Sequence, residues 1–545
     1  MFLRFSSYGL AALCLSLPCF ATDTSSQQAS APFTDPVETY AIQSIDGQRQ
    51  LVAHIDPLTQ ALVVSQLDGS SSDTNHENAA SRIIEQYRTP APDADIETLC
   101  LYEDTSGIGA FFFDVRGMAR QHYLYTKSEK QWQQIALREF AVGGEPEYCM
   151  VDSASGQLFI AEEGIGVWQM SVAPESELSR HLTPLPLAED TASMVMNSAG
   201  NVELTDEKGT VFTIEARQRA FIRDDMPILQ VDGQTATVQR FGDAADDPAI
   251  WVNHAQAEQS LIIGTDKKAG LDVFDLNGNR LQHLPVGRVN NVDVRQSVRF
   301  GQQRMDLAVA SNRSTNSLSV FSINGATQRV AHIVDLPTPL SDIYGLCLYQ
   351  PEEGLEVLVN DSDGTYLRYA LATKNGEFNA SLIEQFSVPS QPEGCVADDK
   401  NHQLFYGEEA TGIWRRSLAK SNAESIKIAG LNDDVQADIE GMDIYYFDQK
   451  RYLVASSQGN DSYAVYALDD NARRLGSFRI GVNFDKGIDG ASETDGLAVS
   501  SVSLGEQYPD GLLVVQDGRN VMPGDKQNFK LISGSKLRQF IRQNR

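Results

Sequence analysis

Short acidic motifs recur along the second half of the chain, most of them beside a glycine-containing turn. Their candidate ligands are Asp246 and Asp247 (DDPAIW), Asp293 (NNVDVR), Glu393 (QPEG), Glu408 and Glu409 (GEEATG), Asp438 and Glu440 (ADIEG), Gln458 (SSQGN), Asp489, Glu493 and Asp495 (IDGASETDG), and Asp517 and Asn520 (VVQDGRN). Carboxylate and amide oxygens in such numbers suit calcium, which takes about six to eight oxygen ligands. A single Asp-Gly is more often a turn than a ligand, so the prediction depends on how many motifs converge. Scattered histidines and the small number of cysteines argue against zinc or copper.

Three cations accompany these acids: Lys267 and Lys268 in TDKKAG, and Arg313 in ASNRS. Taken alone, each is best explained as a solvated turn residue. Together with the acids they suggest phosphate chemistry, because Lys and Arg bind phosphate and clustered metal ions bridge phosphates and activate water.

The net charge of −30 over 545 residues excludes binding to nucleic acid or an anionic membrane unless a basic patch or a cation intervenes. No basic run of useful length is present. Two interpretations of the acid excess remain: a solubilising surface, or carboxylates gathered to hold metal. A strongly acidic protein binds a polyanion only where metal reverses the local charge.

The N-terminus predicts export. Arg4 precedes an apolar stretch from about Tyr8 to Phe20, and Ala21 is a plausible cleavage point. Residues 1–21 therefore read as a signal peptide and residues 22–31 as a polar linker, which places the mature protein in a periplasmic or extracellular compartment. Cys19 offers the alternative of a lipoprotein, although Pro18 sits badly before a lipid-bearing cysteine. No later apolar segment is long enough to predict a membrane span.

Strand-like runs dominate the chain. Apolar runs rich in β-branched and aromatic residues alternate with turns of Gly, Asn and Asp at about 8–12 residues, which predicts an all-β propeller or sandwich. Helical periodicity is restricted to residues 536–545 and, more weakly, to residues 78–88.

The chain also carries a long internal repeat. PEYCMVDSASGQLFIAEEGIGVW (Pro146–Trp168) returns 246 residues later as PEGCVADDKNHQLFYGEEATGIW (Pro392–Trp414). Register comparison shows that the first copy lacks the opening and closing strands of the second. We therefore expect an incomplete, non-catalytic propeller-like domain over residues 32–222 and a complete domain over residues 223–545.

The repeat places one cysteine pair in each copy: Cys100 with Cys149, and Cys347 with Cys395. In an oxidising compartment these pairs suggest two disulfides. Four buried thiols are an equally good interpretation from the sequence.

In its acidic and basic motifs, the second half of the chain resembles the alkaline, calcium-dependent β-propeller phytases, in a tandem form with an incomplete N-terminal domain. The motifs DDPAIW, TDKKAGL, NNVDVR, SNRS, YGLCLY, PEG, DIEGMDIYY, SSQGNDSYAVY, TDGLAV and QNFK occur in the family's order over about residues 240–530. The resemblance implies a six-bladed propeller that binds several structural and catalytic calcium ions. It further implies hydrolysis of the phosphomonoesters of myo-inositol hexakisphosphate by metal-activated water, as in a 3-phytase.

The resemblance also implies residue roles. The calcium ligands fall on Asp246, Asp247, Asp293, Tyr344, Glu393, Glu409, Asp438, Glu440, Gln458, Asp489 and Asp495. The phosphate-binding cations fall on Lys267, Lys268 and Arg313, and the catalytic set comprises Lys267, Arg313, Glu393 and Asp438. The expected substrates are calcium-phytate and lower inositol phosphates, bound by a monomer with no nucleic-acid or membrane partner.

Two departures from the family pattern stand out. A lysine that serves the neighbouring phosphate is missing from VNDSDG, where this chain has Ser362, and Arg368 is the nearest cation in sequence. Arg519 stands in QDGRN, where an acidic or neutral residue suits a calcium loop better. Two rival functions therefore stay open: a lactonase-type calcium hydrolase and a calcium-stabilised binding module.

The first copy keeps acids but lacks their surroundings. Glu147 and Glu163 match Glu393 and Glu409, whereas Pro57 matches Arg313, Glu97 matches Tyr344 and Ala192 matches Glu440. We therefore expect chemistry in the second copy only.

Overall fold

The computed structural model describes residues 40–45, 49–68, 82–144, 146–176, 178–187, 190–216 and 226–545. The expected signal peptide and linker lie outside these residues. Strands make up most of the described structure, which confirms the all-β prediction. No α-helix in these ranges has the length and hydropathy to cross a bilayer.

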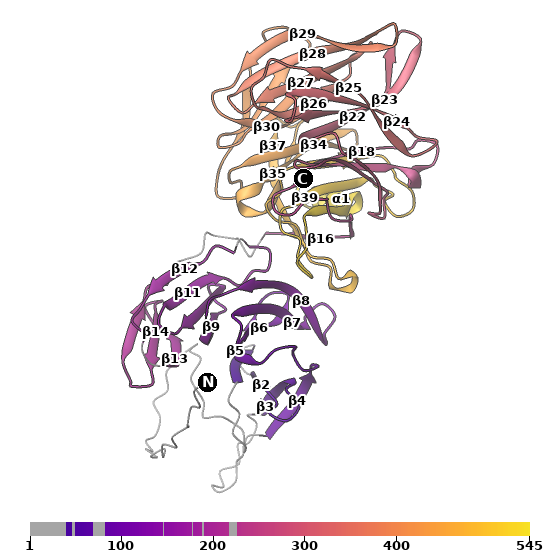
Figure 1. Ribbon diagram of the computed structural model, residues 1–545. Helices are drawn as coiled ribbons and strands as arrows, with labels where there is room; N and C mark the ends of the chain where they lie inside the picture. Colours follow the sequence, from indigo (N-terminus) through magenta and orange to yellow (C-terminus); the bar gives the residue numbers. More distant parts are fainter. Residues whose placement is uncertain are drawn as a thin grey trace.

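The first four sheets form the N-terminal unit (described residues 40–216; Figure 1). They are β1 (Tyr40–Ile45), β2 (Arg49–Ile55), β3 (Leu62–Asp68) and β4 (Arg82–Arg88); β5 (Ile96–Glu103), β6 (Gly107–Asp114), β7 (Met118–Thr126) and β8 (Gln131–Ala141); β9 (Pro146–Asp152), β10 (Gln157–Glu162), β11 (Gly166–Ser171) and β12 (His181–Pro184); and β13 (Thr191–Met196), β14 (Val202–Asp206) and β15 (Val211–Ile214). The first strands of these sheets contact one another in chain order, β1 to β5 to β9 to β13. The unit is thus a run of propeller-like sheets.

Six further sheets form the C-terminal propeller (residues 226–545). Blades 1 to 4 are β18 (Ala245–Trp251), β19 (Leu261–Asp266), β20 (Gly270–Phe274) and β21 (Arg280–Leu284); β22 (Val289–Phe300), β23 (Gln303–Asn312), β24 (Ser317–Asn324) and β25 (Arg329–Pro337); β26 (Ile343–Tyr349), β27 (Leu355–Asp361), β28 (Thr365–Lys374) and β29 (Glu377–Ser387); and β30 (Pro392–Asp398), β31 (Gln403–Glu408), β32 (Gly412–Ser417) and β33 (Ile426–Gly430). Blade 5 is β34 (Ile439–Phe447), β35 (Lys450–Ser457), β36 (Ser462–Ala467) and β37 (Arg473–Gly481), and blade 6 is β38 (Leu497–Ser500), β39 (Leu512–Asp517) and β40 (Asn528–Ser533).

The propeller is a closed ring. The innermost strands β18, β22, β26, β30, β34 and β38 contact one another in order, and β38 returns to β18. Two short strands from the start of the unit strengthen the closure: β16 (Ile228–Gln230) pairs with β37, and β17 (Gly233–Gln234) pairs with β40. The prediction of a six-bladed propeller behind an incomplete propeller-like domain is confirmed.

Apolar side chains between neighbouring blades form the core. One cluster joins Val309 and Leu318 of blade 2 to Leu346 and Val357 of blade 3. Because each blade is covered on both faces, a middle strand such as β19 (LIIGTD) is buried along its whole length. Each buried aliphatic side chain contributes about 1.5–3 kcal/mol relative to exposure.

The innermost strands of blades 1 to 5 share one irregularity. Near the start of each, two residues oppose a single residue of the second strand, which is a β-bulge. The bulged pairs are Asp246–Asp247, Asn290–Asn291, Tyr344–Gly345, Glu393–Gly394 and Glu440–Gly441. Bulges re-aim side chains, so one polar side chain from each of five blades is presented at the same end of the channel.

The helix predictions had mixed outcomes. The expected C-terminal helix is present as α1 (Gly534–Asn544), which buries Leu537, Phe540 and Ile541 against blades 5 and 6. The expected helix over residues 78–88 is wrong for residues 82–88, because Arg82–Arg88 forms β4 and pairs with β3; residues 78–81 lie outside the described residues. Tertiary pairing at the sheet edge outweighs the weak helical pattern of that segment.

Both cysteine pairs form disulfides, Cys100–Cys149 and Cys347–Cys395, so the disulfide interpretation is confirmed over free thiols. Each bond joins the innermost strands of neighbouring sheets, β5 to β9 and β26 to β30. The bonds therefore restrain blade separation in both units.

Replacing Cys347 and Cys395 together by alanine is expected to lower the free energy of unfolding of the propeller by about 3–4 kcal/mol, because a cross-link of this span restricts the unfolded chain. Urea unfolding followed by tryptophan fluorescence measures the change. The matched Cys100/Cys149 double variant should leave the propeller transition in place. An unchanged propeller transition in the Cys347/Cys395 variant would contradict the prediction.

Candidate active site at the end of the propeller channel

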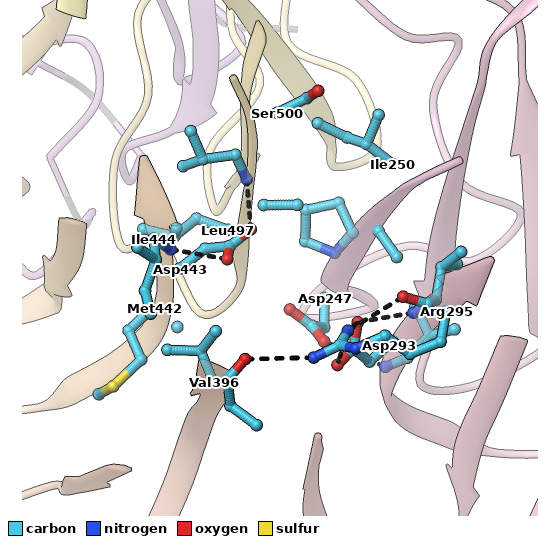
Figure 2. Close-up of a pocket in the computed structure, with 18 of the residues that line it drawn as sticks. Asp247, Ile250, Asp293, Arg295, Val396, Met442, Asp443, Ile444, Leu497 and Ser500 are labelled. Atoms are coloured by element: carbon cyan, nitrogen blue, oxygen red, sulfur yellow. Dashed lines mark hydrogen bonds and ion pairs between the residues drawn. The ribbon is translucent and has the colours of Figure 1, made fainter. Parts of the chain in front are cut away.

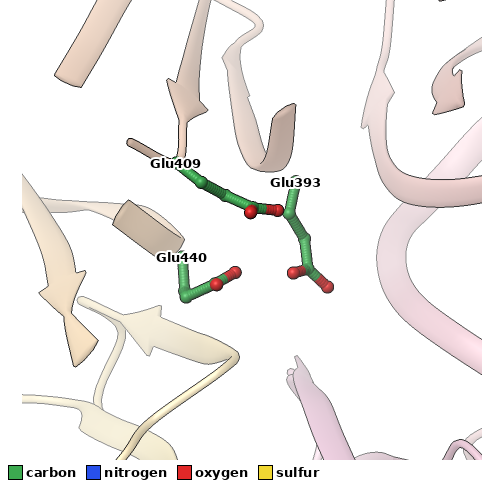
Figure 3. A group of neighbouring side chains, drawn as sticks. All are labelled: Glu393, Glu409 and Glu440. Carbon is green, nitrogen blue, oxygen red and sulfur yellow. The ribbon is translucent and has the colours of Figure 1, made fainter. Parts of the chain in front are cut away.

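Three glutamates converge at the bulged end of the channel (Figure 3). Glu393 lies on β30, Glu409 follows β31 and Glu440 lies on β34, and one carboxylate oxygen from each lies within 4.8 Å of the others. Within the described residues, no other three His, Cys, Asp or Glu side chains bring their ligand atoms this close together. The neighbouring Glu408 instead accepts hydrogen bonds from Ser390, outside this group.

Burial and neighbouring carboxylates raise the pKa values of two of the three glutamates. Burial, with the nearby Glu393 carboxylate, raises the pKa of Glu440 well above its usual value and that of Glu409 to about 7. Glu440 Oε2 and Asp246 Oδ1 are buried and have no hydrogen-bond partner. Buried oxygens left without a donor are expensive, so this set of oxygens fits a bound cation.

Lys267 stands at one side of the cluster, on the turn between β19 and β20. Its Nζ lies 2.7 Å from Asp243, 3.3 Å from Asp246 and 2.8 Å from Asp495. Burial alone would lower the pKa of Lys267, but the Asp246 and Asp495 carboxylates raise it instead. Gln458 donates to the other oxygen of Asp495 at 2.7 Å, so Asp495 orients both side chains.

Arg313 lies at another side of the three-glutamate cluster. Its guanidinium donates to Asn290 Oδ1 at 3.2 Å and to Asp342 at 2.9 Å, and lies over the Tyr344 ring. Asn290 in turn donates to Glu393 at 2.7 Å.

Asn290 is a site residue that sequence reasoning missed, although NNVDVR was singled out for Asp293. Aligning the starts of the five innermost strands would have found it, because Asn290 occupies the same bulge position as Asp246, Tyr344 and Glu393.

Two predicted ligands lie within the channel rather than at the cluster. Asp247 accepts from the Val292 amide, and Asp293 is paired with Arg295 at 2.9 Å (Figure 2). They line a cavity of about 410 Å³ to which all six innermost strands contribute. Burial raises the pKa of Asp443, on the same cavity, to about 7.

Asp489 lies in a third place, among residues of blade 6. It pairs with the fully buried Lys530, which also reaches Asp517 at 3.1 Å. Asp489 additionally accepts from the Val521 amide at 2.7 Å. The predicted ligand set is therefore spread over three groups.

Of the remaining predicted residues, Asp438 lies near the three-glutamate cluster and Lys268 lies away from it. Asp438 lies close enough to Glu393 that this carboxylate, after burial, raises its pKa. Lys268 is exposed, and its ammonium contacts the Phe241 carbonyl at 3.3 Å. Within the described residues, no hydrogen bond or ion pair joins Lys268 to the three-glutamate cluster.

The region of the missing lysine is acidic. Ser362 donates to Asp342, the partner of Arg313. Arg368 does not fill the gap, because it is buried between Glu356 and Glu384 in blade 3.

The N-terminal unit does not repeat this arrangement. Glu147 accepts from the Thr191 amide at 3.1 Å, and burial together with nearby Asp190 raises its pKa to about 7. In the described part of the unit, Glu147, Glu163 and Asp190 do not bring three ligand atoms as close together as the glutamates of the propeller.

The sequence model of the Phytase family matches residues 193–544, from within β13 to the end of α1. The chain belongs to the phytase family. A curated relative, the 3-phytase of Bacillus subtilis (strain 168), is 37% identical over 322 residues, which cover 56% of this chain and 84% of the relative. The phytase match thus contains the entire propeller and the whole three-glutamate cluster.

Gly394 tests how tightly the bulges fix the three-glutamate cluster. A Cβ at Gly394 would overlap the carbonyl oxygen of Glu440 on the next blade, so Gly394→Ala must displace one of the clustered glutamates. We expect phytate hydrolysis to fall by roughly 10- to 100-fold, the usual effect of misplacing a catalytic group. Gly524→Ala, at an open position, is the control, and equal activity of the two variants would count against the prediction.

Metal-free stability should depend on pH through Glu409. Its folded pKa of about 7 exceeds the ordinary value, so the folded state binds more protons than the unfolded state at intermediate pH. Stability from this group is present at low pH and lost as pH rises through 7. In EDTA, Glu409→Gln should therefore gain thermal midpoint relative to wild type between pH 5 and pH 8. A midpoint difference that stays constant would contradict this.

Proposed function

We propose that this phytase hydrolyses the phosphomonoesters of myo-inositol hexakisphosphate in a calcium-dependent reaction and releases inorganic phosphate. The observation that carries the proposal is the three-glutamate cluster, with the partnerless buried oxygens of Glu440 and the nearby Asp246 and with the flanking cations Lys267 and Arg313. The name of the Bacillus subtilis relative supports phytate as the substrate.

Calcium is the cation that best fits the cluster. Its donors are hard carboxylate oxygens, with the Tyr344 hydroxyl and the Gln458 amide nearby, and no His or Cys belongs to the group. Glu393, Glu409 and Glu440 would hold the central ion, with Asp246, Asp438 and Asp495 around it. Bound calcium would supply positive charge against the phosphate oxygens and favour ionisation of an attacking water.

The protein's own residues would bind and orient the substrate. Lys267 and Arg313 would neutralise the non-bridging oxygens of the reacting phosphate, and each is held in place by carboxylates before substrate arrives. Such preorganised charge is worth most where it meets charge developing in the transition state. Among the described residues, Arg313 is the one cation that pairs with Ser362 or Asp342. Because Arg313 would bind the reacting phosphate, orientation by a second phosphate would be weak.

The cations also separate this proposal from a lactonase-type hydrolase. A lactone carries no phosphate charge, so that reaction gives no reason for Lys267 and Arg313 to converge beside the carboxylates. A purely structural binding module would likewise not need buried oxygens without hydrogen-bond donors at the bulged end of the channel.

We also propose that the protein acts after export, in the periplasm or outside the cell. The signal-like residues 1–21 support this. The disulfide in each unit adds independent support, because such bonds persist in oxidising compartments.

Purified full-length protein is expected to release phosphate from phytate with millimolar calcium and to lose this activity when calcium is chelated. Arg313→Ala should lower kcat by about 100-fold, since it removes one preorganised charge from the transition state. Arg329→Ala, an exposed arginine on β25, should leave the rate unchanged. Full activity in chelator, or a normal rate for Arg313→Ala, would disprove the proposal.

A further inference from the structure

The two units meet at loops that belong to blades 5 and 6 of the propeller. Figure 1 shows these yellow loops reaching the N-terminal unit. The Phe484 ring packs edge-on against Tyr123 at 5.3 Å, and the Met522 amide donates to the Leu137 carbonyl at 3.1 Å. Both Phe484 and Met522 pack on the apolar core of the N-terminal unit.

Glu175 makes a side-chain hydrogen bond at this junction. It lies in a turn after β11, and its carboxylate accepts from the Gly490 amide at 2.9 Å. Its backbone carbonyl accepts from Arg519 at 3.2 Å, and Arg519 forms an ion pair with Glu493. A side chain of the N-terminal unit thus binds the segment between β37 and β38 directly.

The turn that carries Glu175 is itself fixed. The buried Arg138 guanidinium donates to the Ser171 carbonyl at 2.8 Å and to the Ser176 carbonyl at 3.3 Å, on both sides of Glu175. Ser176 closes the turn by donating to the Ala173 carbonyl at 2.7 Å. Hydrogen bonds on both sides of Glu175 therefore fix the turn that carries it.

The bound segment leads into the active site. It runs from Val482 to Gly496 and carries Asp489 and Asp495, and Asp495 orients Lys267 and Gln458. Gly490 is five positions before Asp495 in sequence. Within the propeller the segment is also bonded to neighbouring strands and turns, as by the hydrogen bond from Glu493 N to Asp461 at 2.8 Å and the ion pair of Asp489 with Lys530.

We infer that the N-terminal unit positions the Val482–Gly496 segment, with Glu175 as a positioning residue that acts through Gly490 on Asp495 and Lys267. The incomplete unit would then serve the propeller's active site instead of carrying one of its own. This inference rests on the proposed phytase function for its kinetic readout, but its structural readout is independent of it.

The test compares full-length wild type with Glu175→Ala, which removes the acceptor, and Glu175→Gln, which keeps an oxygen acceptor in the same place. Hydrogen–deuterium exchange of amides 490–496 and kcat/KM for phytate are both measured. Glu175→Ala should speed exchange and lower kcat/KM by roughly 3- to 10-fold, the factor expected for one buried hydrogen bond. Glu175→Gln should restore both readouts.

Two further variants make the result decisive. Glu215→Ala, an exposed glutamate of the same unit, should match wild type. Phe484→Ala loosens the same junction without touching Glu175 and should speed exchange in the same amides. Wild-type exchange in Glu175→Ala, or failure of Glu175→Gln to restore it, would overturn the inference. Absent phytate turnover in wild type would refute the proposed function alone, because the exchange comparison would still report on positioning.

Discussion

Buried carboxylates that repel one another lie together at the bulged end of the propeller channel. Two unit charges at the separation within the three-glutamate cluster repel by about 3 kcal/mol at an effective dielectric constant of about 20. The backbone holds these groups together in spite of that repulsion. Bulged glycines allow it: Gly345 lies against the Glu393 carbonyl, and Gly394 against that of Glu440, so no side chain separates successive blades. The fold therefore supplies an anionic site that a cation can neutralise.

Ring closure distinguishes the two copies of the repeat, because within the described residues only the closed propeller brings three carboxylates together. The functional group draws on blades 1 to 5, with Lys267 and Asp495 contributed from opposite ends of the chain's path around the ring. The four sheets of the N-terminal unit keep glutamates at matching positions but do not gather them. What the copy retains is blade packing, its disulfide and a surface that contacts the propeller.

Much of this arrangement is encoded locally and could be predicted. Alternating apolar runs gave the strands, the cysteine spacing in the repeat suggested the disulfides, and motif order pointed to the propeller. The residues that were missed depend on geometry that periodicity does not carry. Asn290 joins the site only because its bulge aligns with those of neighbouring blades. Glu175 forms a hydrogen bond with Gly490, which lies 315 residues later in the sequence. Lys530 pairs with Asp489 from a strand whose sequence pattern does not show which of its side chains point inward. Residues 82–88 were predicted wrongly for a different reason: pairing with β3 outweighs their weak helical pattern.

The most direct test of the central claim is an anomalous-difference map from crystals of the full-length protein grown with calcium. We predict a strong peak between the carboxylates of Glu393, Glu409 and Glu440, which should be lost in the Glu440→Gln protein. A map with calcium bound elsewhere and no peak among these three glutamates would contradict it.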